Sequence, residues 1–157
     1  MKKIINAGDA PETINVALLV ARVGIAVLML THGIPKLLML FSTEPVQFPA
    51  VLGMSAEFSL GLTVFAEVVC SVFLLLGFVT RLAVIPLAIT MLVAALLIHA
   101  SDPFAVKELA MNYFLAYVVL FFAGSGKYSI DYLVQKKSMA TAYAGRGVEN
   151  PLSRVPQ

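Results

Sequence analysis

The sequence predicts an all-α membrane protein, an antiparallel four-helix transmembrane bundle with both termini in the cytoplasm. Of the 157 residues, 60% are hydrophobic and only 13% are charged, and the mean hydropathy is +0.92, which is outside the usual range of soluble domains. Four apolar runs approach or exceed the ~20 residues that a spanning helix needs. These runs lack the alternation of barrel strands, so helices are the structure that satisfies their backbone in lipid.

The four apolar runs set the order of the expected helices. They cover about residues 14–41, 58–79, 82–100 and 109–123. The fourth run is short for a span unless Glu108 and the residues before it belong to the same helix. Only Thr80 and Arg81 separate the second run from the third. These two helices are therefore expected to be antiparallel neighbours.

Basic residues are unevenly shared between the two ends of this bundle. The first and third links carry Lys107 as their one basic residue, whereas the other end holds Lys2, Lys3, Arg81, Lys127, Lys136, Lys137, Arg146 and Arg154. The positive-inside rule therefore places both termini in the cytoplasm. We expect an N-terminal cytoplasmic segment at 1–13, a membrane domain at 14–133 and a polar cytoplasmic tail at 134–157.

The residues after the fourth run predict a short helix at the membrane interface. The sequence YSIDYLVQKK, residues 128–137, offers Ser129 as an N-cap. Lys136 and Lys137 would then reach anionic lipid from the polar face of this helix.

Two ionisable residues lie deep in the predicted spans. Arg22 is placed ~12 Å from the inner edge and Glu67 ~15 Å from the outer edge of a ~30 Å hydrocarbon core, which is nearly the same level. An unpaired charge at this depth costs at least ~2.5 kcal/mol, so we expect Arg22 and Glu67 to form a buried ion pair. Two roles for this pair are open, a polar lock that fixes helix register and a direct part in binding.

Polar residues also gather at the predicted outer edge of the membrane. His32 and Lys36 share one face of the first helix with Arg22. The other helices bring groups to the same level, which gives the ligand-binding candidates His32, Lys36, His99, Glu108 and Asn112. Together these side chains could ring one cavity open to the outside. For Lys36, Glu57 and Lys107 the alternative is snorkelling to the interface.

The sequence assigns no catalytic residue and predicts no metal site. Cys70 is the single cysteine, which excludes a disulfide within the chain, and its apolar surroundings predict a small core residue. His32 and His99 lack the spacing of metal or haem ligands.

Several of these residues occur in an order that resembles the DoxX family, small four-helix bacterial membrane proteins that include DoxD-like members. The resemblance rests on Arg22 with HGxxK at 32–36, on Glu67 with LLLGFVTR at 74–81, and on GSGKYSID at 124–131. It covers residues 14–133, and the polar positions that match the family are Arg22, His32, Lys36, Glu67, Arg81, His99, Glu108 and Asp131. The resemblance implies a multi-pass protein of the bacterial cytoplasmic (inner) membrane.

The resemblance also implies a function. Some relatives are associated with thiosulfate:quinone oxidoreductase, and others resemble membrane partners of proteins that handle sulfur or oxidative stress. The implied role is a membrane subunit of a quinone-linked oxidoreductase system that binds quinone or another small molecule near the outer face. The sequence supplies no intrinsic cofactor, so electrons would come from a partner or a bound cofactor.

The expected partners follow from the membrane spans and from the resemblance to the DoxX family. They are the lipid bilayer, a redox protein on the cytoplasmic or extracytoplasmic side, and a second copy of the chain in a homo-oligomer, with no nucleic acid. Two alternatives to the oxidoreductase role are open. One is a non-catalytic membrane scaffold or assembly partner, and the other is a small transporter or lipid-binding protein.

Overall fold

The computed structural model describes residues 12–144 and is all-helical, with no β-strand in that range. Its elements are α1 (Glu12–Leu40), α2 (Ala56–Val64), the π-helical η1 (Phe65–Cys70), α3 (Ser71–Leu76), α4 (Thr80–Val93), the π-helical η2 (Ala94–Ile98), α5 (Phe104–Ala123) and α6 (Ile130–Ala144). The expected N-terminal segment and the end of the tail lie mostly outside the described residues. So do four basic residues of the charge argument, Lys2, Lys3, Arg146 and Arg154.

Four helical segments of the described chain are long and apolar enough to cross a membrane, Glu12–Leu40, Ala56–Leu76, Thr80–Ile98 and Phe104–Ala123. The predicted all-α membrane class is thereby confirmed. The fourth span is not short, because it begins at Phe104 and includes Lys107 and Glu108 in its first turns. A multi-pass protein of this kind has the lipid bilayer as its main surroundings.

The core lies where four of these elements meet. Its buried residues come from α1, α3, α4 and α5 together with Cys70 at the end of η1, and they include Ala26, Met29, Leu74, Leu87, Tyr113 and Tyr117. The predicted core position of Cys70 is confirmed, since its side chain is buried. Large apolar side chains such as Leu28, Leu62 and Leu115 stay exposed on the outside of the bundle. This distribution suits a protein whose outer surface meets acyl chains.

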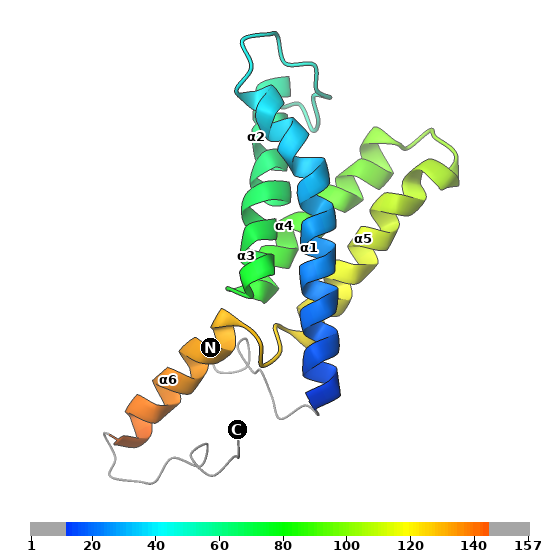
Figure 1. Cartoon of the computed structure of the whole chain (residues 1–157). Coiled ribbons are helices and arrows are strands. Elements are labelled where there is room, and N and C mark those ends of the chain that lie inside the picture. The colour runs from blue at the N-terminus through cyan, green and yellow to red at the C-terminus, as the bar shows by residue number, and fades with distance from the viewer. Residues whose placement is uncertain (1–11, 145–157) are drawn as a thin grey trace.

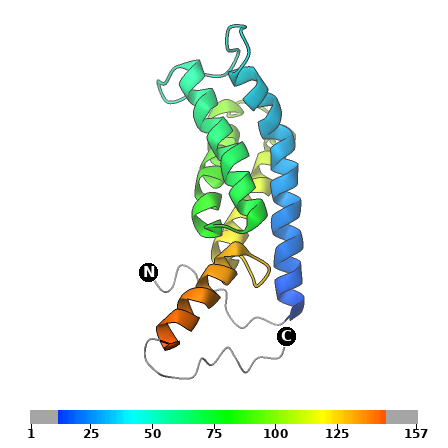
Figure 2. The same cartoon turned by 60° about the vertical axis from the view of Figure 1, so that its left-hand side comes forward.

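The hairpin of α4 and α5 leans away from the rest of the bundle. Figure 1 shows the tips of α4 and α5 well apart from the loop that joins α1 to α2, and Figure 2 shows the same molecule from another side. The amide of His99 bonds to the carbonyl of Ala94, five residues earlier, at 2.9 Å, which is the spacing of a π-helical turn. The loop that follows, residues 99–103, lies apart from the loop that joins α1 to α2 (Figure 1).

The last helix, α6, leaves the bundle at an angle (Figure 1). The Ser129 hydroxyl accepts a hydrogen bond from the amide of Tyr132 at 3.2 Å, so the predicted N-cap is confirmed. The Ser129 hydroxyl also donates to the carbonyl of Gly126 at 2.6 Å. The turn before α6 is thus closed by its own side chain.

Candidate functional site

A carboxylate and an ammonium group meet inside the spanning bundle. Glu67 is only 2% exposed, and both of its carboxylate oxygens accept hydrogen bonds from Lys36 Nζ, at 2.5 and 2.7 Å. The Lys36 side chain is 30% exposed, so the pair joins a buried carboxylate to an ammonium group that is partly accessible. Opposite charges at this distance compensate each other's loss of hydration, which is the condition for burying either of them.

The local backbone explains why these two side chains meet. Glu67 lies in the π-helical segment η1, where the wider turn changes the direction of the side chains from that of a regular α-helix. Gly33, one turn before Lys36, is buried against η1. A Cβ atom at Gly33 would lie 3.0 Å from the Cβ of Glu67 and 2.8 Å from Val68 Cγ2. Glycine at this position therefore permits the close approach of the two helices.

The predicted pair of Arg22 with Glu67 is wrong. Arg22 is buried, but its guanidinium donates to the backbone carbonyls of Ser125, at 3.2 Å, and Tyr128, at 2.6 Å. Gly77 packs against Arg22, as Gly33 packs against Glu67. Arg22 thus lies at the level of the end of α3, about 16 Å along α1 from the level of Glu67. The sequence-based estimate failed because it placed both helices against the same membrane edges and ignored their vertical offset.

Two tyrosines of α5 complete the surroundings of the ion pair. Tyr113 and Tyr117 are buried, stack with ring centroids 6.2 Å apart, and lie within electrostatic range of Glu67. The Tyr117 hydroxyl is buried and has no hydrogen-bond partner among the described residues. The exposed His32 ring meets the edge of Tyr113 at a centroid distance of 5.8 Å. We call Lys36, Glu67, His32, Tyr113 and Tyr117 the ion-pair cluster.

The two tyrosines were missed in the sequence analysis. They stand four residues apart, the spacing of neighbours on one helix face, in an otherwise apolar run. That spacing is the signal that could have found them. The search for ionisable groups overlooked tyrosine because its hydroxyl is neutral at ordinary pH.

The remaining predicted candidates lie elsewhere. His99 Nδ1 lies 2.7 Å from Asp102 Oδ2 in the loop before α5. Glu108 and Asn112 are exposed on α5. The contacts that the structure describes join Lys36 to Glu67 and His32 to Tyr113, and they leave His99 with its loop neighbour Asp102. The structure therefore does not bring the five candidates together in one cavity, and the part of any of them in binding stays a prediction.

A second polar cluster, which we call the backbone lock, holds the opposite end of the bundle. It consists of Arg22, Gly77, Ser125, Tyr128 and Asp131. Gly77 ends α3 with φ at +66°, and a Cβ atom there would overlap the Arg22 guanidinium. A left-handed glycine is thus required both by the turn and by the buried arginine.

Asp131 ties α6 to the turn between α3 and α4. Its carboxylate accepts hydrogen bonds from the amides of Val79, at 2.7 Å, and Thr80, at 3.0 Å, while its own amide donates to the carbonyl of Gly77 at 2.9 Å. Val79 has φ at +43°, a strained conformation for a β-branched residue. The carboxylate stabilises this turn because it pairs the first amides of α4 and lies at the positive end of the helix dipole.

The N-terminal end of α1 also joins this region. The side chain of the buried Asn15 accepts a hydrogen bond from the amide of Lys127 at 3.0 Å. The hydroxyl of Tyr128, a residue outside the spans, donates to Glu12 Oε1 at 2.5 Å, and this hydrogen bond, with the charge of Glu12, raises the pKa of Tyr128. The GSGKYSID motif therefore forms structural contacts.

No group of three or more His, Cys, Asp or Glu side chains in residues 12–144 is arranged to hold a metal ion. The chemistry available at the ion-pair cluster is that of hydrogen bonding and proton exchange.

The fold and its buried charges define a multi-pass membrane protein, and comparison with known proteins places it more closely. The DoxX family model matches residues 17–100, more than half of the chain, and the protein belongs to the DoxX family. A relative in Mycobacterium tuberculosis, the uncharacterized membrane protein Rv3486, is 29% identical over 154 residues, which cover 88% of this chain and 90% of the relative. No solved structure matches.

Proposed function

We propose that this protein is the membrane subunit of a quinone-linked oxidoreductase system, related to sulfur or oxidative-stress chemistry, and that it binds a quinone or similar small molecule at the ion-pair cluster. The observation that carries the proposal is the Lys36–Glu67 pair, whose carboxylate is 2% exposed inside a spanning bundle. An ionisable residue within a membrane span is expensive to bury and usually marks a functional site.

The residues of the cluster fit a quinone head group. Lys36 Nζ has three N–H donors, and the two oxygens of Glu67 accept hydrogen bonds from it. One N–H is therefore left to donate to a carbonyl oxygen of the ligand. The Tyr117 hydroxyl, unpartnered among the described residues, is a second donor. His32 is exposed beside Tyr113, and its imidazole can donate or accept a hydrogen bond.

The division of labour follows from what the chain contains. A quinone would supply the two-electron chemistry that the described side chains lack, and the electrons would come from a partner protein. The chain itself would orient the head group through Lys36 and hold the exchangeable proton at Glu67 or His32. The apolar surroundings of the cluster would strengthen these hydrogen bonds by excluding water.

The orientation in the membrane belongs to the same proposal. We place the four spans as an antiparallel bundle in the bacterial inner membrane, with both termini in the cytoplasm and the ion-pair cluster in the outer half. Support comes from the positive-inside rule, since Arg81, Lys127, Lys136 and Lys137 lie at the end of the backbone lock. A reporter fused after Val134 should be cytoplasmic and one inserted near Pro49 external, and the reverse labelling would contradict this orientation.

Quinone carried through purification tests the function. The full-length protein, solubilised gently and extracted with organic solvent, should yield about one quinone per chain by mass spectrometry. Lys36→Gln and Glu67→Gln should each lower this yield at least tenfold, because both remove the charged pair that orients the head group. Glu57→Gln is the matched control, since Glu57 is exposed and lies ten residues earlier in the same span.

Equal yields in all four proteins, or no quinone in any, would overturn the proposal.

A non-catalytic assembly subunit is the second candidate, and α6 favours it. This helix projects from the bundle and exposes Leu133 and Val134, which suits contact with a partner (Figure 1). A soluble subunit that co-purifies with the Lys36→Gln variant but not after removal of residues 130–157 would support this candidate.

A further inference from the structure

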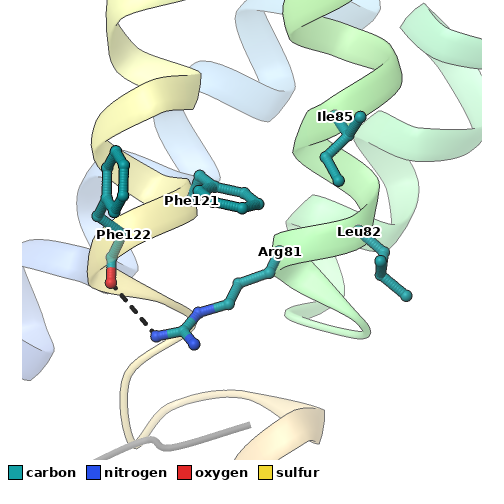
Figure 3. A pocket seen from close by; sticks show the side chains of 5 residues that line it. All are labelled: Arg81, Leu82, Ile85, Phe121 and Phe122. Carbon is teal, nitrogen blue, oxygen red and sulfur yellow. Dashed lines mark hydrogen bonds between the residues drawn. The ribbon is translucent and has the colours of Figure 1, made fainter. Parts of the chain in front are cut away.

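A shallow apolar groove lies on the outside of the bundle, far from the ion-pair cluster along the helices. It runs between the first turns of α4 and the last turns of α5 and encloses about 290 Å³. Its lining consists of Arg81, Leu82, Ile85, Phe121 and Phe122. Figure 3 shows the Phe121 ring extending toward α4, with the Arg81 side chain crossing from α4 to the end of α5. The groove therefore has an apolar body and one cationic end.

The guanidinium at this end is held in place by the backbone of α5. Arg81 Nη2 donates to the carbonyl of Phe122 at 3.3 Å, in the last turn of the helix. The arginine head also lies close to Gly124, where a Cβ atom would be 3.5 Å from it. Carbonyls at a helix C-terminus attract a cation, so the Arg81 side chain is held across the groove. A guanidinium placed in this way is preorganised for an anion that comes to its outer side.

The depth of the groove matches the structure of a lipid molecule. Arg81 is the second residue of the span Thr80–Ile98, and Phe122 is the penultimate residue of the span Phe104–Ala123. Both span ends mark the boundary where phosphate groups of a bilayer lie, and Ile85 and Phe121 lie on the hydrocarbon side of that boundary. An acyl chain would cover the aromatic and aliphatic lining, and a phosphate would meet the guanidinium.

Charge complementarity selects the kind of lipid. The same end of the bundle carries Lys127 and Lys137, and Asp131 is occupied by the amides of the α3–α4 turn. Basic sites between spanning helices favour anionic head groups over zwitterionic ones. We propose that this groove is a specific site for an anionic phospholipid, with its phosphate on Arg81 and one acyl chain between Ile85 and Phe121. The site is independent of the quinone proposal.

Native mass spectrometry of the full-length protein tests this site. The delipidated protein is mixed with phosphatidylglycerol or, separately, phosphatidylcholine, and lipid retention is followed under rising collisional activation. The wild-type protein should retain one phosphatidylglycerol after other lipids are stripped and should hold it at least tenfold better than phosphatidylcholine. Arg81→Gln should remove this preference, and Arg81→Lys should keep part of it, since an ammonium group lacks the planar fork.

Two further variants separate this site from general effects. Lys136→Gln removes the same charge at the same end of the bundle, on an exposed side chain outside the groove, and should retain the lipid like the wild type. Ile85→Trp fills the groove without removing Arg81 and should release the lipid while the helical circular dichroism stays normal. Equal retention of the two lipids by the wild type, equal loss in Lys136→Gln and Arg81→Gln, or undiminished retention in Ile85→Trp would overturn the proposal.

Discussion

Helix α1 carries one buried charge cluster near each end, and the two clusters are built in different ways. In the backbone lock, Arg22 and Asp131 bind main-chain carbonyls and amides. In the ion-pair cluster, Lys36 and Glu67 bind each other's side chains. In the lock, main-chain groups hold both charged side chains, which suits Arg22 and Asp131 to fix the geometry of the bundle end. In the ion-pair cluster two side chains hold each other, and we propose that this pair, unlike the lock, binds a ligand.

The two clusters also differ in their access to the surroundings. Arg22 is 2% exposed, and its partners are carbonyls of the chain itself. Lys36 is 30% exposed, and the exposed His32 lies near the same pair. A ligand could therefore approach the ion-pair cluster from outside the bundle. The GSGKYSID motif contributes residues to the backbone lock, whereas the HGxxK motif contributes His32 and Lys36 to the accessible ion-pair cluster.

Disruption of the backbone lock should give the largest loss of stability. Gly77→Ala places a Cβ atom in the left-handed region, at ~1–2 kcal/mol, and displaces the Arg22 guanidinium, whose charged hydrogen bonds are each worth ~1.5–3 kcal/mol. We expect a loss of ~3 kcal/mol or more, measured as a lower Tm and a smaller folded fraction in detergent. Gly61→Ala is the control, since a Cβ there meets nothing within 4 Å. Equal melting of the two variants would show that the lock is not architectural.

The ion-pair cluster should show a smaller and unequal response. Lys36→Ala leaves Glu67 buried without its partner, and full burial would set the loss at ~3–5 kcal/mol, reduced here because Lys36 is partly exposed. Glu67→Ala should cost less, since Lys36 can turn toward the surface. A double-mutant cycle measured by thermal unfolding should show coupling between Lys36 and Glu67.

The same experiment sharpens the comparison of the two ends. A second cycle with Arg22→Ala and Glu67→Ala should be additive within about 0.5 kcal/mol, because Arg22 and Glu67 lie at different levels of the bundle and share no partner among the described contacts. Coupling of Arg22 with Glu67, or its absence between Lys36 and Glu67, would contradict the separation of the molecule into two clusters.

The smallest effect is expected at the exposed edge of the lock. The pKa of Tyr128 is raised by the hydrogen bond to Glu12, so this contact stabilises the folded state fully below the ordinary tyrosine pKa of ~10 and is lost as pH rises through the higher folded value. Wild-type Tm should therefore fall slightly between pH 9 and 11, beyond the fall seen in Tyr128→Phe. Tyr132→Phe is the control and should respond to pH like the wild type. If Tyr128→Phe also responds like the wild type, the contact between Tyr128 and Glu12 is not maintained.

Local properties of the sequence determined the class of the protein. The length and composition of the apolar runs were enough to predict four spans, because the requirement to satisfy the backbone in lipid acts on each run separately. The N-cap at Ser129 was also predictable, since its partner is three residues away. The buried position of Cys70 followed from the apolar residues around it.

The partners of the buried charges were decided by the tertiary structure. Hydropathy gives each residue an approximate depth but does not give the vertical offset between two helices. That offset depends on close contacts between distant residues, Gly33 with Glu67 and Gly77 with Arg22. Lys36 therefore meets Glu67, and Arg22 meets the carbonyls of a later turn. The sequence specified that these charges need partners because burial without one is costly, and the packing of the helices decided which partners lay within reach.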